Sequence, residues 1–283
     1  MNFVHVTGGD AVSNQSLRSE YFEAACAKKD IQYARHIDTK FSLEDYKNIQ
    51  NQPADIVYRG GLSQKARSIE VALLQPHTRS IYFDNKVVIT GKGSSVQNME
   101  RLGLPIVPGI PFLPRRKREA QEFADYLGGF PLVIKVFGGT EGVGVIRVDS
   151  VESLNSVSDF INTAGNSQVR VMKYIPHQYY VRAVVVGDKV VVATKEPAPE
   201  GDFRGNAYGR RSEQWQEISL THEMERDAVL ATQATGVKAA GVDLMLTEQS
   251  YYIAEANHPF NFAETQMRTG VDIASAILEE MLR

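Results

Sequence analysis

The chain has 283 residues, of which 43% are hydrophobic and 23% are charged, and its formal net charge is −3. This length is enough for two or three subdomains with substantial cores, and the composition is typical of soluble globular proteins. The near balance of charges excludes a bulk electrostatic case for nucleic-acid or membrane binding. The single cysteine, Cys26, excludes an intrachain disulfide. Together with the absence of a signal-peptide pattern and of a membrane-length apolar run, it predicts a cytoplasmic protein.

The first third of the chain alternates short apolar strands with amphipathic helices, which predicts a small parallel sheet. We expect strands at residues 2–7, 31–37 and 55–58, and helices at 16–29 and 63–74. The segment Gly91-Lys92-Gly93-Ser94-Ser95 is interpreted as the start of another helix with a serine N-cap. A proline-punctuated connector follows at 105–114, and the basic run at 115–118 is interpreted as a solvated helix start.

Long strands dominate the chain from residue 130 onward. The pattern predicts strands at 169–175, 179–186, 189–194, 239–246 and 251–256. Helical spacing returns at 221–235 and 272–282. A polar, glycine-containing loop at 197–211 interrupts these elements.

A glycine-rich hairpin follows the apolar strand that contains Lys135. It runs Gly138-Gly139-Thr140-Glu141-Gly142-Val143-Gly144 and leads into a second apolar strand. Glycines let backbone N–H groups turn toward an anion, and Lys135 adds a fixed positive charge, which suits a nucleoside triphosphate. The segment alone fits an ordinary hairpin equally well. It is neither a P-loop nor a dinucleotide fingerprint, because no Gly-Lys-Ser/Thr follows and the next element is a strand.

Two later strands contain candidate metal ligands. Asp243 lies in a buried-type strand, where a charged residue is costly unless it is paired or bound to a metal. Glu255 and Asn257 are two residues apart on the next strand and therefore share a face. If the strands pair, three oxygen ligands converge, a set that Mg²⁺ prefers. The alternative is a buried carboxylate satisfied by an arginine or by backbone N–H groups.

Several basic residues are candidates for binding phosphate or a substrate carboxylate. Arg204 lies in a glycine-containing loop, and arginine can fork two donors onto a phosphate. A surface arginine without function is the default interpretation of that loop. Arg59 follows a buried strand, at the strand end where ligands gather in parallel sheets. Arg59, Lys195 and Arg210 could each hold a carboxylate, although surface solvation is the stronger interpretation. Arg182 is interpreted as a partner of a buried carboxylate.

The order of these motifs along the chain resembles that of the ATP-grasp carboxylate–amine ligases. The motifs are the lysine strand, the glycine flap, the Gly-Asp-Phe-Arg-x-Asn loop, the Gly-Val-Asp strand and the Glu-x-Asn strand. The chain is most similar to the branch with the ribosomal-protein glutamate ligases and the lysine-biosynthesis carrier-protein ligases. The likeness covers roughly residues 86–283 and includes Gly187-Asp188 and Thr269-Gly270-Val271-Asp272. It implies an α/β (α+β) ATP-grasp fold. A small, parallel, Rossmann-like domain at 1–85 would precede a central lid subdomain at 86–170 and a C-terminal subdomain with the metal site at 171–283.

The resemblance also implies roles for individual residues. Lys92 and Lys135 match lysines that contact ATP, and Arg204 and Asn206 match residues near the transferred phosphate. Asp243, Glu255 and Asn257 match the magnesium ligands. The remaining nucleotide-binding positions are the flap residues Gly138, Gly139, Thr140, Glu141, Gly142 and Gly144 and the hinge residues Lys173, Tyr174 and Ile175.

The sequence departs from the family pattern at three places. The hinge has Met172 and Lys173 where the family has an amide and an acid, so adenine recognition must rely on the main chain. Tyr180 takes the position of the acid that holds the ribose. The small-residue loop after the last metal ligand is replaced by residues 258–262. The larger side chains of this loop indicate a different or more apolar substrate, and His258 is therefore a further candidate substrate contact. The alternative is that these side chains only pack the loop.

We therefore expect an ATP-dependent ligase that joins a carboxylate to an amine through an acylphosphate, with ATP and two Mg²⁺ ions (or Mn²⁺) as cofactors. The expected substrates are small-molecule or peptide carboxylates and amines, a protein tail or a carrier protein included. Neither nucleic acid nor membrane is expected as a partner, and a homo-oligomer is expected because ATP-grasp relatives are often dimers or tetramers. The alternatives are a kinase of a carboxylate or hydroxyl substrate and a nucleotide-binding module without catalysis.

Overall fold

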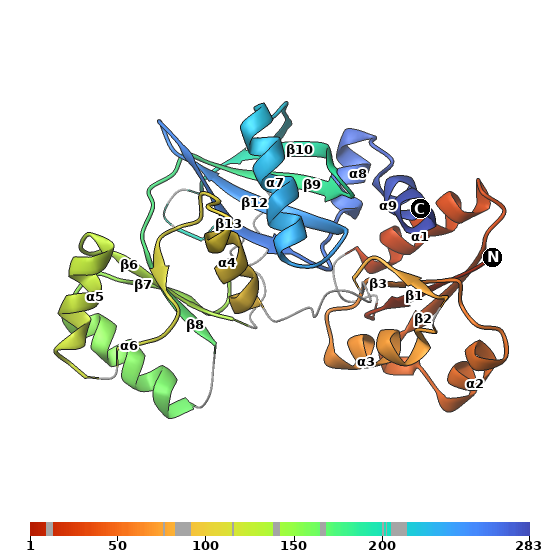
Figure 1. Ribbon diagram of the computed structural model, residues 1–283, viewed down its shortest axis with the longest axis horizontal. Helices are drawn as coiled ribbons and strands as arrows, with labels where there is room; N and C mark the ends of the chain where they lie inside the picture. Colours follow the sequence, from red (N-terminus) through yellow and green to blue (C-terminus); the bar gives the residue numbers. More distant parts are fainter. Residues whose placement is uncertain are drawn as a thin grey trace.

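Three sheets lie one after another along the elongated molecule (Figure 1). The computed structural model describes residues 1–9, 14–75, 77–82, 92–114, 116–137, 142–164, 168–199, 201, 203–204 and 214–283. The N-terminal sheet lies at one end, a five-stranded sheet in the middle, and a four-stranded sheet at the other end. None of the helices in these ranges combines the length and the hydropathy that a membrane span needs.

The N-terminal sheet is parallel throughout, with strand order β2-β1-β3-β4, as the alternating pattern predicted. Apolar side chains of β1 and β3 are buried on both faces, because helices cover both sides of such a sheet. Its strands are β1 (Asn2–Thr7), β2 (Gln32–Ile37), β3 (Ile56–Arg59) and β4 (Arg79–Ser80). Its helical segments are α1 (Gln15–Ala27), η1 (Asp38–Lys40), α2 (Leu43–Asn51) and α3 (Gln64–Leu73).

The sheet at the far end has strand order β5-β8-β6-β7 and is antiparallel. Helices α5 and α6 bury their apolar residues against one face of it. The strands are β5 (Gly109–Ile110), β6 (Leu132–Val136), β7 (Val145–Val148) and β8 (Val169–Lys173), and the helices are α5 (Glu119–Leu127) and α6 (Val151–Ala164). The predicted boundary between residues 170 and 171 falls inside β8.

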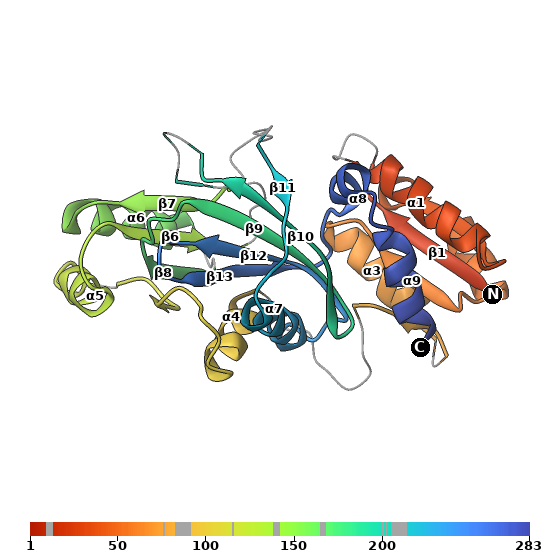
Figure 2. The same ribbon diagram turned by 90° about the horizontal axis from the view of Figure 1, so that it is seen from above.

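The middle sheet is antiparallel with strand order β11-β10-β9-β12-β13. Helix α7 packs against four of its strands, and α4 lies beside α7 (Figure 2). The predicted serine N-cap of α4 is wrong, because Ser94 and Ser95 lie within the helix. The strands are β9 (Tyr179–Val186), β10 (Lys189–Pro197), β11 (Gln216–Glu217), β12 (Ala239–Leu246) and β13 (Tyr251–Asn257). The helices are α4 (Lys92–Arg101) and α7 (His222–Ala234).

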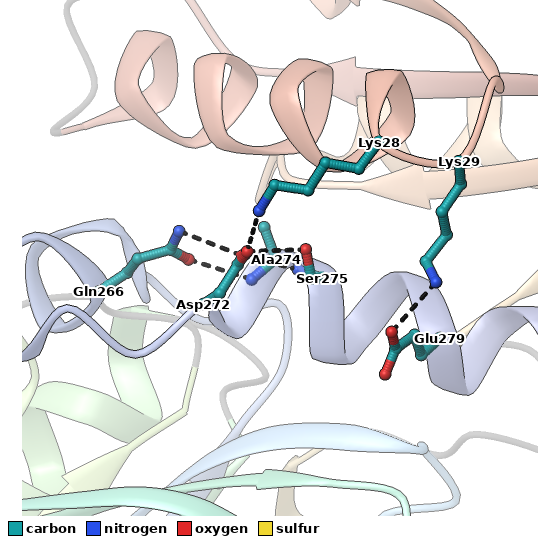
Figure 3. Close-up of polar contacts among 7 residues, drawn as sticks. All are labelled: Lys28, Lys29, Gln266, Asp272, Ala274, Ser275 and Glu279. Carbon is teal, nitrogen blue, oxygen red and sulfur yellow. Dashed lines mark hydrogen bonds and ion pairs between the residues drawn. The ribbon is translucent and has the colours of Figure 1, made fainter.

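The last two helices, α8 (Ala263–Thr269) and α9 (Ile273–Leu282), return to the N-terminal domain. Helix α9 packs along α1, where Lys28 Nζ lies 2.6 Å from Asp272 Oδ2 and Lys29 Nζ lies 3.1 Å from Glu279 Oε1 (Figure 3). One apolar core joins Phe3 and Phe22 to residues of α9 and of the middle sheet. The N-terminal and middle sheets are therefore connected by a continuous core.

Candidate active site

A row of three charged side chains crosses three neighbouring strands of the middle sheet. Asp243 on β12 pairs with Arg182 on β9 and with Glu255 on β13. Directly opposed residues share a face, so all three side chains lie on the same side of the sheet. Arg182 approaches Asp243 with two donors: its Nε lies 2.5 Å from Oδ1, and its Nη2 donates to Oδ2 at 3.2 Å. The prediction that Arg182 is the partner of a buried carboxylate is confirmed.

A β-bulge determines which residues of β13 face this site. The register passes from Asp243–Glu255 to Leu244–Ile253, so Ala254 is an extra residue. In a regular strand Ile253 would share the face of Glu255 and Asn257. With the bulge, Ile253 is buried in the apolar core at 2% exposure, while Glu255 pairs opposite Asp243. The bulge thus lets one strand supply both a core residue and two site residues.

Two further hydrogen bonds complete the polar cluster. Asn257 Nδ2 donates to Asp243 Oδ2 at 2.9 Å, and Lys135 Nζ, from β6 of the neighbouring sheet, donates to Glu255 Oε2 at 2.6 Å. Burial raises the pKa of Asp243. The Arg182 charge opposes that rise, and the Glu255 charge adds to it. The two acids therefore lie close enough to repel, and a cation between them would relieve the repulsion.

The donor set of this cluster fits magnesium. Two carboxylates and one amide are hard oxygen ligands, and Mg²⁺ in phosphate sites usually takes one or two carboxylates and completes its shell with water and phosphate oxygens. Among the described residues there is no group of three or more His, Cys, Asp or Glu side chains arranged for a metal. Asp243, Glu255 and Asn257 are thus a set that would need phosphate oxygens to complete the coordination.

A cleft that is open to solvent lies beside this cluster, between the two sheets and α4. Lys135 and Glu255 line it together with mostly apolar side chains, which suits a planar base. The full lining is Ser95, Val96, Met99, Ile106, Val107, Lys135, Phe137, Arg170, Met172, Ile253, Ala254, Glu255 and Ala256. Of the predicted hinge region, only Met172 is in this lining. The N–H groups of Lys173 and Tyr174 donate to the carbonyls of Pro108 and Pro131 at 3.0 and 3.3 Å.

Arg170 is a cleft residue that sequence reasoning missed. It pairs with Lys135 across the β6–β8 ladder and is only 2% exposed. Its Nη2 reaches Glu100 Oε1 at 3.5 Å and the Val107 carbonyl at 3.4 Å, both long contacts for a buried cation. A Cβ at Gly109 would lie 2.6 Å from its Nε, so the glycine makes room for it. An arginine inside an apolar strand pattern was the available signal.

The loops expected around the phosphates are described only in part. Tyr180 Oη donates to the Phe203 carbonyl at 3.1 Å, which ties β9 to the residue before half-buried Arg204. Gly142 and Gly144 have left-handed φ angles of 76° and 85° at the base of the predicted flap. The predicted residues Gly138, Gly139, Thr140, Glu141, Asn206 and Arg210 lie outside the described residues. Lys92 begins α4, and its side chain is likewise outside them.

Of the predicted substrate contacts, Arg59 and His258 both lie against the ring of Tyr82, whereas Lys195 lies elsewhere, on β10. Arg59 is 3% exposed, and its Nε donates to Glu70 Oε2 at 2.6 Å, so its charge is matched within the N-terminal domain. His258 lies against the ring of Tyr82, with ring centroids 6.4 Å apart. Lys195 lies on the opposite face of β10 from the site, with its Nζ 4.5 Å from the centre of the Tyr179 ring. Its neighbour Glu196, which was not singled out from the sequence, lies on the site face.

Comparisons with known proteins agree with this geometry. The model of the RimK-like ATP-grasp domain matches residues 64–281. A probable alpha-L-glutamate ligase from Chromohalobacter salexigens is 34% identical over 244 residues, which cover 83% of this chain and 78% of the relative. The ribosomal protein bS6--L-glutamate ligase of Escherichia coli is 32% identical over 187 residues, 65% of this chain and 60% of that protein. The chain thus spans about three fifths of the length of some of these relatives.

Solved structures show the same fold across the whole chain. The ATP-grasp ligase PsnB, in a complex with a precursor variant, Mg and ADP, has a TM-score of 0.74 at 16% identity and covers 98% of both chains. The D-cycloserine synthetase DcsG has a TM-score of 0.74 at 15% identity and covers 99% of this chain and 100% of its own. The chain belongs to the RimK-like ATP-grasp family.

Proposed function

We propose that the protein is an ATP-dependent carboxylate–amine ligase that forms an amide bond on a peptide or protein substrate. The observation that supports this most is the Lys135–Glu255 ion pair, which joins the two sheets beside the Asp243 cluster and lines a largely apolar cleft. A base in the cleft would place its phosphates toward these charges. Relatives named as L-glutamate ligases, one of them for a ribosomal protein, support a peptide or protein as a substrate.

In the proposed reaction a carboxylate oxygen attacks the γ-phosphorus of ATP and the bond to the β-phosphate oxygen breaks, which gives ADP and an acylphosphate. The amine nitrogen then attacks the acyl carbon, the carbon–oxygen bond to phosphate breaks, and the nitrogen loses a proton. No covalent bond to the protein is needed, so catalysis rests on positioning and on stabilising negative charge. Lys135 and Arg204 supply positive charge on the protein side.

Asp243, Glu255 and Asn257 would hold magnesium, which neutralises charge on the phosphate oxygens when it is bound. The Arg182 charge favours the ionised form of Asp243 by pairing with it. Lys135 pairs with Glu255 and lies in the cleft lining, so it can exchange this partner for a phosphate oxygen. We propose two ions at this site, with Mn²⁺ able to replace Mg²⁺. Metal titrations monitored by nucleotide binding test both points.

The test is ADP release over pairwise mixtures of carboxylates and amines, peptides included, with mass spectrometry of the product. The expected result is ADP release that requires a carboxylate, with an amide of the summed mass minus water. Hydroxylamine in place of the amine should trap the acylphosphate as a hydroxamate. A stable phosphorylated product without any need for an amine would instead identify a kinase. ATP binding without ADP release over the whole panel would identify a nucleotide-binding module.

A further inference from the structure

Glu196 is a half-buried carboxylate on the same face of the middle sheet as the metal cluster. It pairs with Tyr180 of β9, and Thr194, two residues before it, pairs with Arg182. Arg182 in turn pairs with Asp243. Since residues two apart on a strand share a face, Glu196 lies one step along the sheet from the Arg182–Asp243 pair, on the same side.

The surroundings of Glu196 contain an aromatic wall and an ion pair. Gln216 pairs with Lys195, so the preceding residue, Trp215, lies at the level of Glu196. The Arg268 guanidinium lies over the Trp215 ring, 5.1 Å from its centre, and its Nη2 is 3.1 Å from Glu264 Oε1. Both members of this ion pair are 28% exposed, so this side of the site is open to solvent.

The positive charges near Glu196 do not neutralise its carboxylate. Arg182 is engaged by Asp243 and Arg268 by Glu264, and within the described part of the chain no hydrogen bond or ion pair engages the Glu196 carboxylate. Burial raises its pKa. The Arg182 charge opposes this rise, the Asp243 charge adds to it, and Arg268 and Glu264 have smaller effects of opposite sign. A partly buried carboxylate with this deficit favours a cationic partner.

We infer that Glu196 is a specificity-determining residue that binds the ammonium group of the acceptor amine, with Trp215 and Arg268 forming one wall of that subsite. This inference rests on the proposed ligase function and deepens it. An amine acceptor is an ammonium ion at neutral pH. It must approach the acyl carbon beside the metal cluster and lose one proton to solvent before its nitrogen attacks. Glu196 is the described carboxylate on this face that neither the metal cluster nor an arginine uses. The acceptor it selects is a primary amine, such as the α-amino group of an amino acid.

Trp215 is the only tryptophan in the chain and reports directly on this subsite. The experiment titrates the protein, saturated with ADP and Mg²⁺, with each of the protein amino acids and with its N-acetyl derivative, and follows tryptophan fluorescence. We expect at least one free amino acid to change the emission and its N-acetyl derivative to bind 10- to 100-fold more weakly, roughly the effect of losing one charged hydrogen bond. Glu196→Gln should weaken the binding of the free amino acid by the same factor. Glu248→Gln, a change at an exposed position, should leave that binding unchanged.

The inference is overturned if the free and the N-acetylated amino acids bind equally well, or if no free amino acid changes the fluorescence. It is also overturned if the titration of Glu196→Gln equals that of the unchanged protein. Hydroxamate formation separates this outcome from a failure of the proposed function. Hydroxylamine is uncharged at neutral pH and does not need an ammonium-binding carboxylate, so the unchanged protein should form the hydroxamate whether or not Glu196 binds the acceptor. If the unchanged protein forms no hydroxamate with any carboxylate, the ligase proposal itself fails.

Discussion

Gly241, two residues before Asp243, leaves the space in which Arg182 crosses β12. A Cβ at this position would lie 2.5 Å from Arg182 Nη1 and 3.2 Å from Phe260 Cβ. Gly241→Ala should therefore push the guanidinium off Asp243 and lower the free energy of unfolding by about 1–3 kcal/mol, the usual cost of overpacking. Urea denaturation measures the change. Gly9→Ala is the matched control, because a Cβ there meets nothing within 4 Å, and equal midpoints for the two variants would contradict the prediction.

Arg204 tests whether the loop after β10 acts on the transferred phosphate. Its neighbour Phe203 is held by Tyr180, so the loop has a fixed attachment to the site face of β9. Arg204→Ala should leave ATP affinity nearly unchanged and lower kcat by about 10²–10³-fold, as for other donors that stabilise charge in the transition state. Calorimetry of ATP binding and steady-state ADP release measure the two effects. Unchanged amide formation would remove Arg204 from the mechanism.

Glu255 tests the metal site. Glu255→Gln removes one carboxylate and the partner of Lys135, but it keeps the size of the side chain. The expected result is that magnesium no longer tightens ADP binding and that amide formation is lost, because one hard, charged ligand is missing. Calorimetric titrations of ADP with and without Mg²⁺ measure this directly. A magnesium effect as large as in the unchanged protein would argue against the ligand set.

At the scale of elements, the sequence predicted the long strands well, but it missed the helices α2 and α6. Strands β1, β9 and β12 have the predicted bounds, because alternation and turn residues mark them clearly. The two-residue strands β4, β5 and β11 were not predicted, since two residues are too few to show an alternation of apolar and polar side chains. Helix α8 was also missed, because it is only seven residues long.

The faces of the strands explain which site residues could be predicted. Asp243, Glu255 and Asn257 were found because a buried acid and an i, i+2 pair are visible in sequence. The sequence could not show that β10 turns Glu196 rather than Lys195 toward the site, since this depends on the register with β9. The same holds for the bulge at Ala254, which becomes visible only when the partner strand is known.

Arg18 on α1 links the N-terminal domain to the loop that follows β13. It is 3% exposed and donates to the Gly60 and Phe260 carbonyls, both at 3.1 Å. Arg18→Met should leave both buried carbonyls without this donor and lower the free energy of unfolding by about 2–3 kcal/mol. Urea denaturation measures it. Arg18→Lys should recover only part of the loss, because an ammonium group lacks the planar fork, and full recovery would show that charge alone matters.

At the scale of the whole molecule, the packing of α9 on α1 combines exposed ion pairs with a buried apolar face. Lys28 and Asp272 are 64% and 40% exposed, and exposed pairs of this kind contribute about 0–1 kcal/mol each. Ile277 on α9 is fully buried, so Ile277→Ala should cost about 2–5 kcal/mol. The double change Lys28→Ala with Lys29→Ala should cost less than about 2 kcal/mol. Thermal and urea denaturation compare the two variants, and a larger loss from the lysine changes would reverse this ranking.

The return of α9 to α1 also sets an order of events during synthesis on the ribosome. Lys28 and Asp272 are separated by 244 positions in the chain. At ordinary rates of translation this interval takes roughly 10–50 s, during which α1 has emerged but its partner helix has not. The apolar face of α1 that later meets α9 must therefore remain uncovered, or be shielded by a chaperone, until the last helix is made.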